Sequence, residues 1–210
     1  MPTLSPTWDG YVGAGTSAWA NLMTATSGKS FVYSQESQTE AIKVSANSNN
    51  TAHEKYEVFL EFPSIGASVE SATLKFYAEN VEASAGTMGI RGLKGSWTNN
   101  TSNNFNDFIP FTEYFTAIEE VVEGWNTVSL NAGALSQLET GALKIFLVEE
   151  FVYTSAGNFN SQPDAGYSKN CDFYFSESDD KAPYIDYTLS NGSIIHKEGL
   201  IQINSGRIVL

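Results

Sequence analysis

Three acidic side chains stand close together in the stretch FYFSESDDKAPYIDYTL, residues 173–189, namely Glu177, Asp179 and Asp180. Carboxylate oxygens are ligands that Ca²⁺ prefers, so this cluster predicts a structural calcium ion, the one cofactor that the sequence suggests. The spacing matches no EF-hand, because the glycine and the distal glutamate of that loop are not in place. A hydrophilic turn is the alternative interpretation, with Pro183 leading into the next strand.

The acidic residues do not predict an enzyme. Glycoside hydrolysis needs two carboxylates on opposite sides of a cleft, and neighbours on one loop are rarely placed so. The single cysteine, Cys171, lies in a predicted strand and is expected to be a buried small hydrophobic residue. His53 and His196 are isolated, and no GxSxG elbow occurs. We therefore expect no catalytic residues.

Aromatic side chains are the other group that could bind a ligand. The chain holds four tryptophans, ten tyrosines and thirteen phenylalanines. Trp8 and Trp19 lie in an irregular N-terminal stretch, where an exposed ring could stack on a glycan or anchor into a neighbouring subunit. The sequence does not decide between these two kinds of contact.

The net negative charge of the chain limits the kinds of partner that it can bind. The 210 residues include 11 basic and 24 acidic side chains, for a net charge of −13. This field would repel nucleic acids and anionic membranes, so neither is an expected partner. No run of 18 apolar residues occurs, which predicts no membrane insertion. The start of the chain lacks the basic and apolar regions of a secretory signal, so we expect synthesis in the cytoplasm and use there or after lysis.

Apolar and polar residues alternate with a period of two along most of the chain, which indicates strands with one buried face. Helical signals are few: residues 112–124 could form about two turns, and residues 132–141 could form a short turn that ends at Gly141. Neither could cover a sheet, so we predict an all-β fold, an antiparallel two-sheet β-sandwich. The predicted strands span residues 54–62, 71–81, 87–97, 126–131, 142–153, 171–177 and 184–189.

The residue pattern of the chain changes near its end. Residues 190–210 contain three turn signals, beginning with Asn191-Gly192, and short apolar alternations lie between them. This pattern predicts a small β-meander or hairpin extension outside the sandwich. A small isolated meander is marginally stable, so its apolar residues are expected to contact the domain or another subunit. These assembly residues are Leu200, Ile201, Ile203, Ile208 and Leu210.

The predicted organisation is an N-terminal arm or first-strand region over residues 1–20, a sandwich over 9–189 and the extension over 190–210. Several motifs in the sandwich region follow one another in a familiar order. They are DGYVG (9–13), PSIGASVESATLKFYA (63–78), GLKGSWT (92–98), GWNTVSLNAGALSQLETGALKIFLV (124–148) and FYFSESDDKAPYIDYTL (173–189).

This order resembles the DNRLRE-type β-sandwich domains, although the six-letter motif that names them is absent. The resemblance implies a jelly-roll-like sandwich and places Trp97 and Trp125 at structural positions, which we expect to be in the core. Such domains occur in cell-surface and secreted proteins, in carbohydrate-binding modules and in phage structural proteins. Fold alone does not decide among these functions.

Two functions are therefore predicted. The first is a non-catalytic structural protein of a phage virion, such as a capsid decoration protein or a tail or fibre subunit, whose partners are other virion proteins or copies of itself. The second is a carbohydrate-binding module that mediates adhesion to host glycans. The expected location is the virion in the first case, and a virion that adheres to glycans would unite both.

Overall fold

The computed structural model of the chain describes residues 2–25, 30–33, 37–84, 86–97, 114–150, 162–190, 194–197 and 200–203. Twelve strands form one hydrogen-bonded sheet, and every strand pair is antiparallel, so the predicted all-β antiparallel class is confirmed. The strands are β1 (Thr3–Leu4), β2 (Trp8–Thr16), β3 (Ser30–Tyr33), β4 (Ser37–Ala46), β5 (His53–Phe62), β6 (Val69–Ala83), β7 (Gly89–Lys94), β8 (Tyr114–Glu120), β9 (Gly124–Ser129), β10 (Leu143–Glu149), β11 (Ser168–Tyr174) and β12 (Tyr184–Leu189).

The sheet branches at β5. One edge of β5 pairs with β2 through residues 53–61. Its other edge pairs with β4 through residues 53–56 and with β10 through residues 58–62. One branch continues from β4 through β11 to β6, and the other continues from β10 through β7 to β8. β9 and β12 pair with β6, and β1 pairs with β12.

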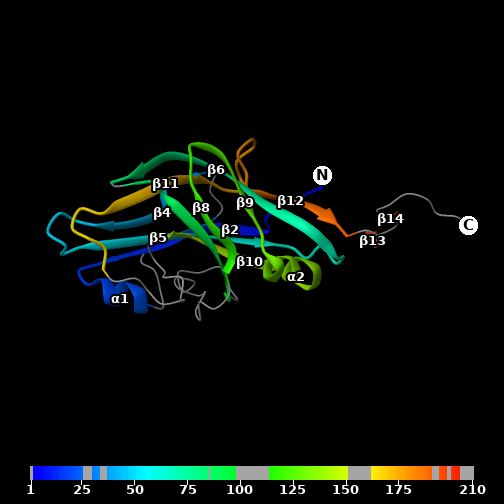
Figure 1. Cartoon of the computed structure of the whole chain (residues 1–210), viewed down its shortest axis with the longest axis horizontal. Coiled ribbons are helices and arrows are strands. Elements are labelled where there is room, and N and C mark those ends of the chain that lie inside the picture. Colours follow the sequence, from blue (N-terminus) through cyan, green and yellow to red (C-terminus); the bar gives the residue numbers. More distant parts are fainter. Residues whose placement is uncertain are drawn as a thin grey trace, which may run out of the picture.

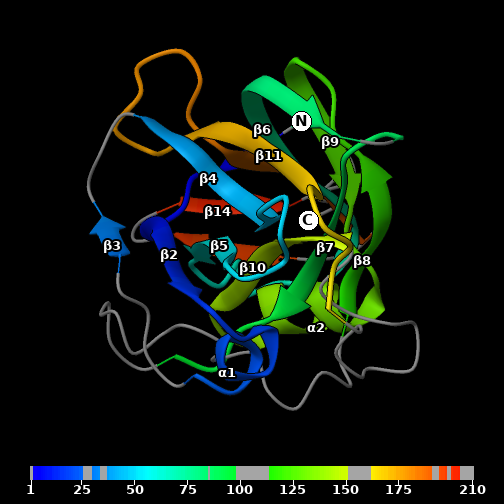
Figure 2. The same ribbon diagram turned by 90° about the vertical axis from the view of Figure 1, so that its left-hand side faces the viewer.

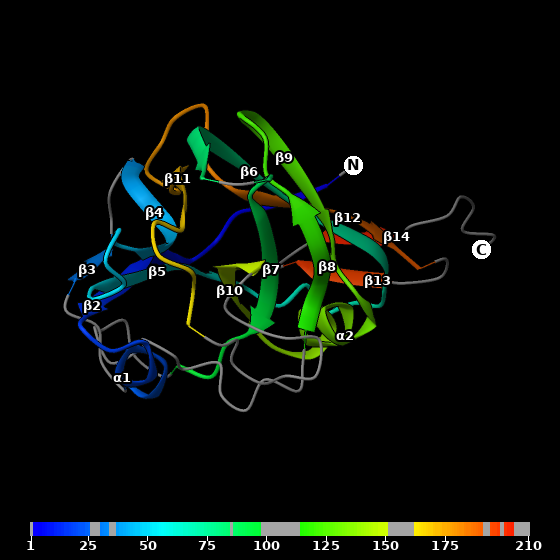
Figure 3. The same ribbon diagram turned by 60° about the vertical axis from the view of Figure 1, so that its left-hand side comes forward.

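The two branches curl around a common core. Figure 2 shows β4, β11, β6 and β9 passing above it and β5, β10 and β7 below it. The branches approach each other again where β8 contacts β9, as Figure 3 also shows. The structure therefore holds one curled, branched sheet where we predicted two separate ones. The reason is that β5 belongs to both branches, so the backbone hydrogen bonds never break into two sets.

Buried side chains form two clusters. The larger lies between the branches and includes Val58, Leu60 and Phe62, which share one side of β5. The smaller lies on the opposite side, around Phe59. The helix α1 (Trp19–Thr24) contacts β2 and β5 and contributes two buried side chains to this second cluster. Strand alternation thus supplies apolar residues to both sides of β5.

The two helical predictions differ in outcome. The short turn predicted over residues 132–141 is the helix α2 (Ala132–Thr140), and the Asn131 side chain caps it by accepting the Ala134 N–H at 3.1 Å. The helix predicted over residues 112–124 is wrong, because Tyr114–Glu120 form β8, which pairs with β7. Aromatic and β-branched residues suit a strand, and the available partner decided the outcome. No helix in the described part of the chain is long and apolar enough to cross a membrane.

The two ends of the chain differ. Within residues 1–20, β1 pairs with β12 and β2 pairs with β5, so most of the predicted N-terminal arm belongs to the sheet. At the other end, β13 (Ile194–Lys197) and β14 (Leu200–Ile203) form a separate two-stranded sheet. Figure 1 shows this hairpin beyond the end of β12. Leu200, Ile201 and Ile203 therefore lie on β14, whereas Ile208 and Leu210 lie outside the described residues.

A buried ion pair lies at the point where the sheet branches. The Lys55 Nζ and a carboxylate oxygen of Glu57 are 2.5 Å apart, and both side chains are fully buried. Burial lowers the pKa of Lys55, and the facing Glu57 carboxylate opposes that shift. In the sheet, Lys55 stands opposite Val44 of β4, and Glu57 stands opposite Val12 of β2. The pair therefore lies where β4 and β10 separate.

We expect the Lys55→Met variant to lose about 3–5 kcal/mol of unfolding free energy, because it removes the cation that faces the buried Glu57 carboxylate. The Lys55→Met/Glu57→Leu variant should be much closer to the original protein, since it removes both charges. Urea denaturation followed by circular dichroism measures both. A double variant no more stable than the single one would show that the loss in Lys55→Met does not come from the charge left on Glu57.

Candidate binding site

Side chains from four strands meet on the outer face of one branch. Along β6, Leu74, Phe76 and Ala78 face the core, so the alternate residues Lys75 and Tyr77 face outward. In the neighbouring strands, Trp125 of β9 stands opposite Tyr77, and Tyr184 of β12 stands opposite Lys75. Strand pairing thus places on one face residues that are far apart in the sequence.

Four rings form what we call the aromatic face: Tyr77, Trp125, Tyr174 and Tyr184. The Tyr77 ring centroid lies 5.6 Å from that of Trp125 and 5.5 Å from that of Tyr174, and both ring pairs are nearly perpendicular. Trp125 also lies 5.5 Å from Tyr184. Its side chain is nevertheless 43% exposed. Edge-to-face pairs of this kind stabilise each other by about 0.5–1.5 kcal/mol, so the rings are held in place while Trp125 stays open to solvent.

Two lysines complete the aromatic face. The Lys181 Nζ lies 4.4 Å from the Tyr77 ring centroid, 4.2 Å from that of Tyr174 and 2.6 Å from a Glu79 carboxylate oxygen. The Tyr174 hydroxyl donates to the other oxygen of Glu79 at 2.7 Å. These hydrogen bonds raise the pKa of Lys181 and lower that of Glu79.

The second lysine, Lys75, is placed in the same way. Its Nζ lies 3.0 Å from Asp186 and 5.7 Å from the Tyr184 ring centroid. Both lysines thus lie over aromatic rings, where the ring electrons attract the cation. Because each lysine also faces a carboxylate, the aromatic face combines ring surfaces with polar groups but has balanced charge.

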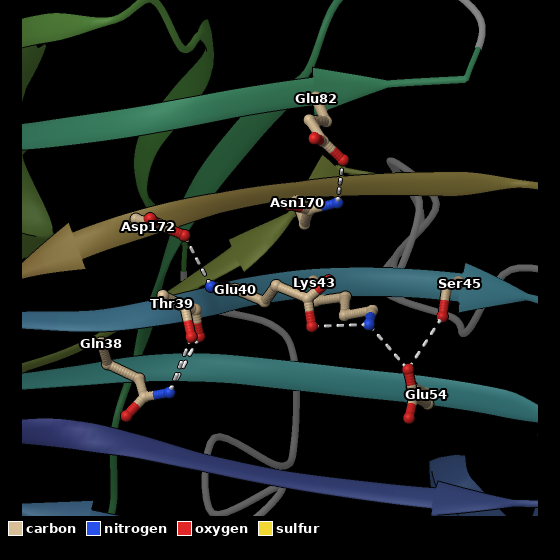
Figure 4. A network of polar contacts seen from close by, with 9 residues as sticks. All are labelled: Gln38, Thr39, Glu40, Lys43, Ser45, Glu54, Glu82, Asn170 and Asp172. Atoms are coloured by element: carbon tan, nitrogen blue, oxygen red, sulfur yellow. Dashed lines mark hydrogen bonds and ion pairs between the residues drawn. The ribbon is translucent and has the colours of Figure 1, made fainter.

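Beyond the rings the outer face becomes polar, across β11, β4 and β5 (Figure 4). Asp172 of β11 accepts the Glu40 N–H at 2.9 Å and the Asn80 side-chain amide at 2.6 Å. Both of these partners have a φ of +49°, and the pairing register shifts beside each of them. Asp172 thus ties two bulges, one in each neighbouring strand, to β11. Bulges change the direction of nearby side chains, and the one at Asn80 adjoins Glu79 of the aromatic face.

The same polar region holds a bridged lysine. The Lys43 Nζ lies 2.8 Å from Glu40 and 2.7 Å from Glu54, and the Ser45 hydroxyl donates to Glu54 at 3.3 Å. The network therefore joins β4 to β5 on the outer face, as Asp172 joins β4 and β6 to β11.

The three acidic residues that predicted a calcium site do not point toward a common ion position. Glu177, Asp179 and Asp180 are all exposed. Among the residues that the structure describes, no group of three His, Cys, Asp or Glu side chains is placed to hold a metal ion. The calcium site stays a prediction, and the exposure of its three candidate ligands favours the alternative interpretation of a hydrophilic turn.

A different aspartate holds this turn. Asp9 of β2 is buried and accepts the Ser176 N–H at 2.6 Å and the Ser176 hydroxyl at 3.0 Å. Burial raises the pKa of Asp9 to about 6, the hydrogen bonds from Ser176 oppose this shift, and the Glu177 charge adds to it. The sequence analysis missed this pair, because its members are 167 positions apart.

Two of the four tryptophans, Trp19 and Trp125, lie where the sequence analysis did not place them. Trp97 is buried as expected, but Trp125 is exposed, which corrects its expected place in the core. Trp19, expected as a binding contact, is only 5% exposed and packs in the second cluster, because α1 folds over β2 and β5. Trp8 is 39% exposed, on β2 and outside the aromatic face. The exposure of Trp125 could have been inferred, since Val128 faces inward and strand positions alternate.

No protein-family model matches the chain, and no curated protein matches it. The resemblance to DNRLRE-type domains therefore stays a prediction. The aromatic face itself can bind a ligand that presents apolar surface to the rings and hydroxyl groups to the lysines and carboxylates.

The raised pKa of Asp9 predicts a pH dependence of stability. Because the folded state favours the protonated carboxyl, its contribution to stability is complete below pH 3.8 and is lost as the pH rises through about 6. We expect unfolding free energies measured between pH 4 and 7 to fall with pH by up to about 3 kcal/mol more in the original protein than in Asp9→Asn. Parallel profiles of the two proteins would contradict the role assigned to Asp9.

Proposed function

We propose that the protein is a non-catalytic interaction protein that binds glycans through the aromatic face. The observation that supports this best is the exposed Trp125 ring, held by two tyrosines on a rigid sheet. The C–H face of a sugar ring packs on such a surface, while its hydroxyls bond to charged groups at the rim. Ligand sites commonly combine aromatic side chains with a few well-placed polar groups in this way.

Catalysis is not part of the proposal. A glycosidase needs a carboxylic acid whose pKa is raised so that it can donate a proton. On the aromatic face the Lys181 ammonium and the Tyr174 hydroxyl instead lower the pKa of Glu79. Asp186 likewise faces Lys75. Glu79 is thus better suited to accept hydrogen bonds from a ligand than to act as an acid.

The finer fold prediction belongs to the same proposal. We interpret the two branches of the sheet as the two layers of a jelly-roll-like sandwich, joined through β5 and brought together again where β8 contacts β9. The proposed relation to DNRLRE-type domains agrees with this interpretation. In it, the aromatic face is the outer surface of one layer.

We expect Trp125→Ala to reduce glycan affinity at least about fivefold, taking for a sugar ring packed on Trp125 the roughly 1–3 kcal/mol that a base gains by stacking on an aromatic side chain. A glycan microarray followed by affinity electrophoresis measures this. Trp8→Ala is the matched control, since Trp8 is similarly exposed but outside the aromatic face. Loss of binding in Trp8→Ala alone would move the site to β2. Absence of binding to every glycan tested would overturn the proposal.

A second function is supported by the hairpin of β13 and β14. Among the described strands these two pair only with each other. A two-stranded sheet is marginally stable alone, and its free edges can pair with strands of another chain. We therefore also propose assembly with further copies or with other virion proteins, as in a capsid decoration protein or a tail or fibre subunit. A virion subunit that binds host glycans would combine the two functions.

Removal of residues 191–210 should abolish assembly and leave the large sheet folded. The cut keeps Ser190, whose N–H donates to the Ser68 carbonyl at 3.0 Å. Light scattering reports the assembled mass, and urea denaturation reports the stability of the remaining domain. A control truncated after residue 203 keeps both hairpin strands. Normal assembly of the 191–210 deletion would show that the hairpin is not required.

A further inference from the structure

A shallow groove lies beside Tyr184, at one end of the aromatic face. It has a volume of about 310 Å³ and is lined by Thr3, Ser5, Ala182, Pro183, Tyr184 and Asp186. This volume is at the lower end of the range for small-molecule sites. Tyr184 and Asp186 belong both to the groove and to the contacts of the aromatic face.

The N-terminal strand forms one wall of this groove. Thr3 stands opposite Asp186 and Leu4 stands opposite Ile185 in the pairing of β1 with β12. The Tyr187 N–H also donates to the Pro2 carbonyl at 3.3 Å. The hydroxyl-bearing residues Thr3 and Ser5 are therefore held beside Tyr184 by backbone hydrogen bonds to the sheet.

The angles between the rings limit the form of the ligand. The Trp125 ring is inclined by 87° to Tyr77 and by 65° to Tyr184. Neighbouring rings are thus not coplanar, so they cannot lie flat together on the surface of a crystalline polysaccharide. They can contact successive faces of one chain that turns along its length.

Charge limits the chemistry of the ligand. Lys181 and Lys75 each face a carboxylate, so the aromatic face offers no net charge to attract a charged polymer. The chain as a whole carries −13, which repels polyanions. Neither the balanced charge of the aromatic face nor the net charge of the chain disfavours a neutral sugar chain, because such a chain needs only ring surfaces and hydrogen-bonding groups.

We propose that the ligand is a single, neutral polysaccharide chain that crosses Trp125 and Tyr184 and ends in the groove between β1 and residues 182–184. This inference rests on the proposed glycan-binding function and assigns it a chain type, a direction and a second subsite. Residues 3–5 are then part of the binding site as well as of the sheet edge.

The test compares Ser5→Arg, which fills the groove, with Ser136→Arg, which places the same substitution on an exposed position of α2. Affinity electrophoresis uses soluble neutral polysaccharides (hydroxyethylcellulose, glucomannan and xyloglucan), alginate and chitosan. A pull-down uses microcrystalline cellulose. We expect binding to at least one soluble neutral chain, weakened about tenfold by Ser5→Arg, the effect of 1.4 kcal/mol, and unchanged in Ser136→Arg.

Each of the other outcomes contradicts a defined part of the inference or of the proposed function. If Trp125→Ala loses binding but Ser5→Arg keeps it, the groove is wrong and the proposed function stands. Binding only to cellulose crystals, alginate or chitosan overturns the chain type. If the original protein binds none of these polymers and no glycan on a microarray, the proposed function fails together with this inference. Circular dichroism of each variant confirms that the sheet is intact.

Discussion

The structure depends on how the two edges of β5 are used. A strand has only two edges, and β2 occupies one edge of β5 along residues 53–61. The other edge is divided between β4 and β10, so the sheet must separate into two branches beside Glu57. The space between the branches becomes the core, and the buried pair of Lys55 and Glu57 lies where they part. Branching thus encloses the core without interrupting the hydrogen-bonded sheet.

The candidate binding face is a consequence of the same arrangement. Because one side of β6 faces the core, its other side is exposed together with the matching sides of β9, β11 and β12. Aromatic rings occupy one part of this surface, and the polar network around Asp172 occupies another. Glu40 and Asn80 have a positive φ at the two bulges where the pairing register shifts, and their hydrogen bonds to Asp172 hold both bulges against β11. A rigid sheet can hold side chains in the fixed relation that ligand binding requires.

The proposed activities use separate parts of the molecule. The aromatic face belongs to the branch that contains β6, whereas the hairpin of β13 and β14 pairs with no strand of the large sheet among the described residues. One surface can therefore bind a glycan while the other contacts a neighbouring subunit. Neither glycan binding nor subunit assembly requires an acid or a nucleophile with a shifted pKa. Burial raises the pKa of the Cys171 thiol, which makes this cysteine unreactive.

Local patterns in the sequence determined the all-β class, most strands after residue 53 and the helix α2, because alternation and capping depend on residues close together in the chain. The strands β3 and β4 were missed, and β2 was predicted only as the first-strand alternative for residues 1–20. Glycines interrupt the alternation of β2, where Gly13 leaves space for the Tyr56 ring. Only the tertiary structure decided that residues 114–120 pair with β7 and that α1 packs Trp19 against β2 and β5. It also decided that Asp9 holds Ser176. These outcomes depend on which distant segments become neighbours, and a single sequence carries no local signal of that choice.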